Sequence, residues 1–157
     1  MMQKADNIAF HRVTSDTDSA VFSALSVLDK KCVGADGWSA ESFKSEVEKD
    51  NGIVICCYAD CCIVGLICGY FAGDEADITS VAVDENYRRC GIAVQLIMEF
   101  EKNLPDYISE IFLEVRESNI PAISLYEKCG FEKLSVRKNF YENPPENAVV
   151  MVRKLKK

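Results

Sequence analysis

The order of the predicted strands and helices is the feature that most limits the folds open to this chain. Alternating apolar and polar residues indicate strands, and apolar residues three or four positions apart indicate helices. Along the 157 residues the order is strand, two helices, three strands, helix, strand, helix and two strands. This order predicts an α/β fold with a mixed sheet. The length suits one core, so we expect a single domain over residues 1–157.

Turn and capping residues set the limits of these segments. The predicted strands span residues 8–13, 53–57, 62–71, 77–83, 108–115, 131–138 and 148–155. Thr14-Ser15-Asp16 supplies cap candidates for the first helix, Ser39 for the second and Ser118-Asn119 for the last. The polar stretch from Glu142 to Asn147 predicts a loop between the two terminal strands.

The charge of the chain bears on its partners. The formal net charge is −7 and the isoelectric point is near 4.8. This argues against direct nucleic-acid binding, because the neutralisation of phosphates requires clustered Lys and Arg. An acidic surface keeps a protein soluble, and it also attracts basic polypeptides. Both interpretations of the charge remain open.

Hydrophobic and cysteine content bear on the compartment. No apolar run reaches the length of about 20 residues that a membrane-spanning helix needs, and Met1 to Asp6 lack the core of a signal peptide. The chain has eight cysteines, which without a secretory signal are expected to be reduced thiols. We therefore expect a cytoplasmic protein with no membrane partner.

Four of the cysteines raise the question of a metal site. Cys56-Cys57 and Cys61-Cys62 flank a short polar turn, and zinc is one interpretation of them. Adjacent residues of a strand point to opposite faces, so four such thiols do not converge easily on one ion. We expect no metal, and cysteines that pack as small apolar residues of a hairpin.

The segment from Val81 to Ala93 predicts a strand that passes through a short turn into a helix. The first amides of a helix have no partners within it, and the helix dipole is positive there, so a phosphate can accept their hydrogen bonds. Gly91 and Ala93 would let phosphates approach the main chain. The alternative is an ordinary strand-to-helix turn that contains a glycine.

Within this segment, Arg88-Arg89-Cys90-Gly91-Ile92-Ala93 resembles the acetyl-coenzyme A motif of the GNAT superfamily, Gln/Arg-x-x-Gly-x-Gly/Ala. The resemblance continues downstream to the ribosomal-protein-alanine N-acetyltransferase (RimI) branch. The similar segments are Phe112–Asn119, Ala122–Glu127, Gly130-Phe131, Arg137–Tyr141 and Gly37-Trp38-Ser39. Phe140 and Gly37 depart from the Tyr and Pro of that branch. The resemblance implies a mixed, mostly antiparallel sheet of six to seven strands flanked by about four helices.

The resemblance also implies a binding site for acetyl-coenzyme A, the acetyl donor. The cofactor-binding residues that it implies are Val81, Val83, Arg88, Arg89, Cys90, Gly91, Ile92, Ala93, Asn119 and Tyr126. The amides of the motif would hold the pyrophosphate, and those of Val81 and Val83 the pantetheine arm and acetyl carbonyl. Helix capping alone would also explain Asn119.

Two residues are implied as catalytic. Glu114 would act as the general base, and Tyr126 would donate a proton to the sulfur of coenzyme A. The alternative for Glu114 is a surface carboxylate paired with Arg116, and for Tyr126 a ring packed between helix and sheet. Trp38 and Tyr141 are candidates for binding the acceptor, or for packing.

The resemblance therefore implies an acetyl-coenzyme A-dependent N-acetyltransferase that acts by direct transfer in a ternary complex. The leading expectation for the acceptor is the N-terminal α-amine of a protein, such as an alanine of a small-subunit ribosomal protein. A small amine, such as a polyamine, an amino acid or an antibiotic, is one alternative. A regulatory module that binds acetyl-coenzyme A without turnover is another. We expect a monomer or weak dimer.

Overall fold

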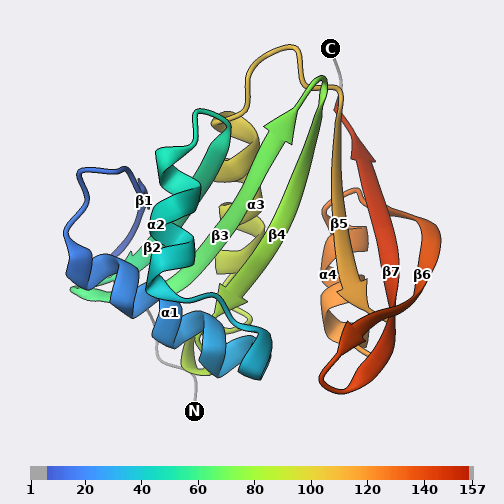
Figure 1. Ribbon diagram of the computed structural model, residues 1–157, viewed down its shortest axis with the longest axis horizontal. Coiled ribbons are helices and arrows are strands. Elements are labelled where there is room, and N and C mark those ends of the chain that lie inside the picture. Colours follow the sequence, from blue (N-terminus) through green and yellow to red (C-terminus); the bar gives the residue numbers. More distant parts are fainter. Residues whose placement is uncertain (1–6, 156–157) are drawn as a thin grey trace.

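The computed structural model describes residues 7–155, which form one seven-stranded sheet with four α-helices (Figure 1). The strands lie in the order β1-β2-β3-β4-β5-β7-β6. They are β1 (Ile8–Arg12), β2 (Gly52–Ala59), β3 (Cys62–Ala72), β4 (Glu75–Val83), β5 (Glu110–Arg116), β6 (Glu132–Glu142) and β7 (Pro145–Lys154). The helices are α1 (Ser19–Val33), α2 (Ala40–Glu48), α3 (Ile92–Lys102) and α4 (Ile120–Lys128), with 3-10 turns η1 (Gly34–Asp36) and η2 (Glu85–Tyr87). Neighbouring described strands run antiparallel except β4 and β5, so the predicted sheet is confirmed.

Helices cover both faces of the sheet, and each face has its own apolar core (Figure 1). On one face, Phe43 of α2 packs with residues of α1, β2 and β3. On the other, Phe100 of α3 and Ile123 of α4 belong to a larger core. Cys56 and Cys57 lie in different cores, because successive residues of a strand point to opposite faces. Burial raises the pKa of both thiols to about 11, so they pack as uncharged side chains.

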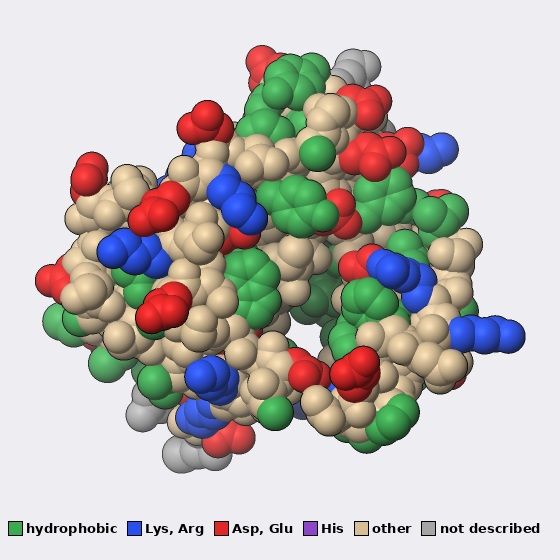
Figure 2. Space-filling view, in the orientation of Figure 1, with side chains coloured by type: hydrophobic (Ala, Val, Ile, Leu, Met, Phe, Trp, Pro, Cys, Tyr) green, Lys and Arg blue, Asp and Glu red, His purple; other side chains and the backbone are tan. Residues whose placement is uncertain are grey.

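β4 and β5 diverge in the middle of the sheet. Residues Glu75–Ile78 pair in parallel with Glu110–Leu113, and beyond them neither strand bonds the other. β4 continues to Val83 beside β3, and β5 continues to Arg116 beside β7. Figure 1 shows the strands separating towards their carboxyl ends, and Figure 2 shows a hollow in the surface there. The sheet is therefore open where the chain turns towards α3 and α4.

The caps of α2 and α4 are those predicted, and the cap of α1 is not. Ser39 and Asn119 accept main-chain hydrogen bonds at the starts of α2 and α4. The cap of α1 is Asp18, which accepts a hydrogen bond from the amide of Ala20, so the prediction of Thr14-Ser15-Asp16 is wrong. These residues belong instead to a turn that Thr17 closes by accepting a hydrogen bond from the Thr14 amide.

The predicted loop from Glu142 to Asn147 is also shorter than expected. β6 and β7 remain paired as far as Glu142 and Pro145, which leaves a two-residue turn at Asn143 and Pro144. The segment Met1–Asp6, expected to lack a signal-peptide core, lies outside the described residues.

Candidate active site

The turn between β4 and α3 presents main-chain amides that the helix does not use. α3 begins after Gly91, which has a left-handed φ of 78°, and no side chain caps its first turn. The amide of Gln95 donates to the Gly91 carbonyl oxygen, so the amides of residues 92–94 precede the first bond within the helix. With the positive end of the helix dipole, these amides can bind an anion.

A cavity of about 940 Å³ lies between this turn, the end of β4 and the start of α4. Nine of the ten predicted cofactor residues line it, namely Val81, Val83, Arg88, Arg89, Gly91, Ile92, Ala93, Asn119 and Tyr126. The tenth, Cys90, is exposed, and its thiol donates to the Arg88 carbonyl at 3.6 Å. Cys32, at the end of α1, also lines the cavity, although nothing in its sequence neighbourhood indicated this.

The open edge of β4 contributes main-chain groups to the cavity. The amide of Asp84 donates to Val64 of β3, so the amides of Val83 and Val81 point the other way, towards the gap before β5. The Val83 carbonyl accepts a hydrogen bond from Arg88 Nε at 3.1 Å. Free amides at a helix start and along a strand edge fit a diphosphate carrying an extended amide-containing arm, which is the chemistry of coenzyme A.

Tyr126 lies in α4 with its side chain half-buried at the cavity. Its ring meets Phe131 edge-on, with centroids 5.9 Å apart. Burial raises the pKa of the Tyr126 phenol, and the neighbouring Tyr141 and Cys129 raise it further. The hydroxyl therefore stays protonated at neutral pH and can donate a hydrogen bond to a group in the cavity.

Glu114 lies on β5 outside the cavity lining, at the other side of the opening. Its Oε1 is 3.2 Å from Nη1 of Arg137 on β6. The alternative pairing with Arg116 is not observed, because Arg116 is engaged with Asp36 and Glu146. A second carboxyl lies near: the pKa of Asp77 is raised by burial and by the charge of Glu114.

Of the two candidate acceptor residues, Tyr141 lies near the catalytic candidates and Trp38 packs elsewhere. Burial and then the Glu114 charge raise the pKa of Tyr141. Tyr141 in turn raises the pKa of Tyr126. Tyr141 therefore lies within electrostatic reach of both. The Trp38 ring is 5.4 Å from that of Phe43, and its amide donates to Asp29, so it packs the segment between α1 and α2.

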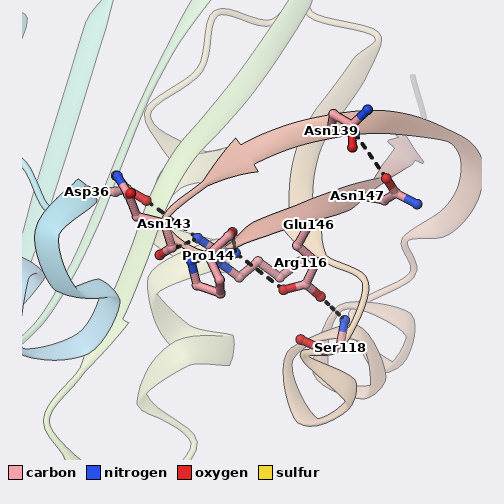
Figure 3. Close-up of polar contacts among 8 residues, drawn as sticks. All are labelled: Asp36, Arg116, Ser118, Asn139, Asn143, Pro144, Glu146 and Asn147. Atoms are coloured by element: carbon pink, nitrogen blue, oxygen red, sulfur yellow. Dashed lines mark hydrogen bonds and ion pairs between the residues drawn. The ribbon is translucent and has the colours of Figure 1, made fainter.

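A polar network at the acceptor end was not predicted (Figure 3). Arg116 joins Asp36 after α1 to Glu146 at the start of β7, and Glu146 accepts a hydrogen bond from the Ser118 amide. Asp36 is 80 positions from Arg116 along the chain, and no local sequence pattern pairs such residues. The network ties the end of β5, two residues beyond Glu114, to the turn after α1, the start of β7 and the loop before α4.

Two further structural findings concern ligands and membranes. Within residues 7–155, no three His, Cys, Asp or Glu side chains are grouped so that they could hold a metal ion. None of the helices in that part of the chain is long and apolar enough to cross a membrane.

Residues 5–131 match the model of the acetyltransferase (GNAT) family. The chain belongs to this family. An N-alpha-acetyltransferase of Saccharolobus solfataricus is 49% identical over 83 residues, which are 52% of this chain and 49% of that protein. The ribosomal protein bS18-alanine N-acetyltransferase of Escherichia coli K12 is 39% identical over 84 residues, 50% of this chain and 55% of that protein. The chain thus matches about half the length of these curated relatives.

A crystal structure extends the likeness to the whole GNAT fold. The ribosomal-protein-S18-alanine N-acetyltransferase of Escherichia coli superposes with a TM-score of 0.79, covering 95% of this chain and 96% of that chain at 24% identity. At this identity the superposition shows a shared fold. The resemblance seen in the sequence to the GNAT superfamily and its RimI branch is therefore confirmed.

Proposed function

We propose that this chain transfers the acetyl group of acetyl-coenzyme A to the N-terminal α-amine of a protein in the cytoplasm. One observation carries the proposal: a single cavity at the divergence of β4 and β5 joins the free amides before α3 to Tyr126. A diphosphate at one end and a thioester sulfur at the other would suit these groups. Family membership and the names of the two relatives support it.

The main chain does most of the binding in this proposal. Bound acetyl-coenzyme A supplies an acetyl thioester, which an uncharged amine can attack. The amides of residues 92–94 hold the diphosphate, and those of Val81 and Val83 hold the arm and the acetyl carbonyl. Arg89 adds positive charge beside the diphosphate, while Arg88 supports the end of β4 through the Val83 carbonyl.

Glu114 and Tyr126 handle the protons. Glu114 accepts, through water, the proton that the acceptor amine loses, which is a modest task because α-amines have a reference pKa of about 7.7–8.0. Tyr126 donates a hydrogen bond to the departing sulfur of coenzyme A. Its raised pKa lies above the value of about 8.5 for a thiol, so the phenol acts mainly as a hydrogen-bond donor while the thiolate forms.

The acceptor is proposed from charge and from relatives. The net charge of −7 and the neighbouring carboxyls of Asp77 and Glu114 favour a positively charged acceptor. A ribosomal protein that begins with alanine combines a basic chain with an exposed α-amine, and the name of the Escherichia coli relative points to this class. We propose such a protein as the substrate.

The test is to incubate the protein with isotopically labelled acetyl-coenzyme A, ribosomal proteins, alanine-initiated peptides and a panel of polyamines, amino acids and aminoglycosides. Mass spectrometry then locates the label. Label on a protein N-terminus supports the proposal. Label on small amines alone overturns the acceptor assignment, and binding without any labelled product overturns the enzymatic one in favour of a cofactor-binding module.

A further inference from the structure

Two arginines flank Glu114, and one of them is already fully engaged. Arg116, two residues along β5, donates to the carbonyl oxygens of Pro144 and Asn143 at 2.9 and 3.2 Å, and to Asp36 and Glu146 (Figure 3). Its guanidinium also lies 4.3 Å from the centroid of the Tyr141 ring. These contacts hold Arg116 towards the turn between β6 and β7, so it is not free to serve Glu114.

Arg137 is the second arginine, and it is paired with Glu114 while its side chain remains largely exposed. The Glu114 side chain is 25% exposed, whereas that of Arg137 is 56% exposed. Apart from Glu114, the guanidinium of Arg137 contacts the exposed ring of Phe140 and lies 4.5 Å from the centroid of that ring. Exposed ion pairs contribute only about 0.2–1 kcal/mol, so a second cation can readily displace this one.

The fold places Arg137 there through a bulge in β6. The register of β6 against β7 shifts between Arg137 and Tyr141. At its centre Asn139 has a left-handed φ of 55°, and its amide donates to the Asn147 side chain at 3.0 Å (Figure 3). Bulges bend a strand and redirect its side chains. Here the bulge lies between Arg137, which is paired with Glu114, and Tyr141, which is stacked on Arg116.

We propose that Arg137 is a specificity-determining residue, an internal cation that occupies the Glu114 carboxylate until the ammonium group of the acceptor displaces it. The inference rests on the proposed function, because it requires Glu114 to meet the acceptor amine. The guanidinium lies where a substrate cation would pair with Glu114. When an ammonium group displaces Arg137, a new ion pair with Glu114 replaces the one that is lost. An uncharged acceptor that displaces Arg137 forms no ion pair in return. The exchange therefore selects for positively charged amines.

The test compares Arg137→Ala with Arg137→Lys and with Lys133→Ala in steady-state acetylation of an alanine-initiated peptide. Lys133 is a matched control, because it pairs with Met151 of β7 and so lies on the opposite face of β6 from Ser135 and Arg137. Removal of the competing cation should lower the acceptor KM about two- to fivefold at low salt, with kcat nearly unchanged. Arg137→Lys and Lys133→Ala should behave like the wild type.

A charge-specific measurement separates competition from a structural role. Calorimetry with coenzyme A bound should show the unmodified peptide binding more tightly to Arg137→Ala, while the N-acetylated peptide binds both proteins equally. Equal gains for both peptides, or a KM that is unchanged or raised, would overturn the inference while wild-type turnover still stands. If the wild type acetylates none of the acceptors, the proposed function fails, and this inference fails with it.

Discussion

The cofactor end and the acceptor end of the opening between β4 and β5 are built in different ways. At the cofactor end the proposed binding groups are main-chain amides, fixed by the left-handed Gly91 and by the edge of β4 that β5 leaves unpaired. At the acceptor end the proposed binding group is the side chain of Glu114, which is paired with Arg137, and the Arg116 network begins two residues farther along β5. Main-chain geometry changes little with sequence, whereas a network of side chains changes with each substitution. Single substitutions should therefore change the proposed acceptor site more readily than the proposed donor site.

The largest effect is expected from Glu114→Gln, which removes the proposed base without changing the size of the side chain. Turnover should fall about 100-fold or more, and most at lower pH, where more of the acceptor amine is protonated. Steady-state kinetics across pH check this. Glu110→Gln, at the start of the same strand, is the control and should leave turnover unchanged. A pH profile in Glu114→Gln that matches the wild type would remove Glu114 from the role of base.

Tyr126→Phe tests the point where the two ends meet. The variant keeps the ring against Phe131 and loses the hydroxyl, so turnover should fall about 10- to 100-fold while acetyl-coenzyme A binds as before. Tyr107→Phe removes an exposed hydroxyl and serves as the control. Single-turnover kinetics and calorimetry measure the two quantities. Wild-type turnover in Tyr126→Phe would count against the assignment as donor to sulfur.

Arg116→Ala should sharpen the contrast by damaging the acceptor end alone. The loss of hydrogen bonds to a charged group should lower the free energy of unfolding by about 2 kcal/mol. The acceptor KM should rise several-fold, because the end of β5 that follows Glu114 is no longer tied to Asp36 and Glu146, while the Kd for acetyl-coenzyme A stays within about twofold. If the binding of the acceptor and of acetyl-coenzyme A were weakened equally, the acceptor end and the cofactor end would not be independent.

Gly91→Ala should damage the cofactor end and leave the acceptor end intact. A φ of 78° costs a residue with a Cβ about 1–2 kcal/mol, although the added atom would meet no described atom within 4 Å. Relaxation of the turn moves the amides of residues 92–94, so the affinity for acetyl-coenzyme A should fall about tenfold. Gly73→Ala provides the control, since Gly73 also has a positive φ, of 61°, and open space around it. It should lose similar stability with no loss of affinity in calorimetry.

The smallest effect is expected from Asp77→Asn. Burial and then the charge of Glu114 raise the pKa of Asp77 above its reference value of 3.8, so the folded protein loses stability as pH rises through the raised pKa. Asn removes this cost and keeps an oxygen that can accept a hydrogen bond from Tyr70. The Tm should rise by about 1 °C at neutral pH, and the difference should vanish below pH 3.8. The exposed Asp106→Asn is the control.

The cofactor end could be predicted from the sequence, and most of the acceptor end could not. Strand and helix periods are local signals, so the fold followed from short segments. The motif from Arg88 to Ala93 is also local, and the family resemblance that it carries implied ten cofactor positions, nine of which line the cavity. Arg116, Asp36 and Glu146 come from the end of β5, a 3-10 turn and the start of β7, which are distant in sequence, and they carry no periodic signal. Glu114 and Tyr126 were found through family resemblance alone. Their roles stay predictions that the variants above test.

The errors at chain turns have a similar origin. Thr14, Ser15, Asp16 and Asp18 all belong to residue types that cap helices well, so residue type alone could not locate the start of α1. β6 and β7 pair along most of the polar stretch after Glu142. The stretch resembled a loop in sequence because an edge hairpin buries few side chains and so needs few apolar residues. In both places several conformations suit the local sequence, and the contacts made by the folded chain decide among them.

The short parallel pairing of β4 and β5 has a consequence for dynamics. The centre of a sheet is usually its slowest region in amide hydrogen exchange, because each amide there has a strand partner. Here the amides of Val81 and Val83 face the gap at the centre and should exchange as fast as those of a surface loop. Only a ligand laid along β4 would slow them, so their protection directly reports how much of the donor site is filled.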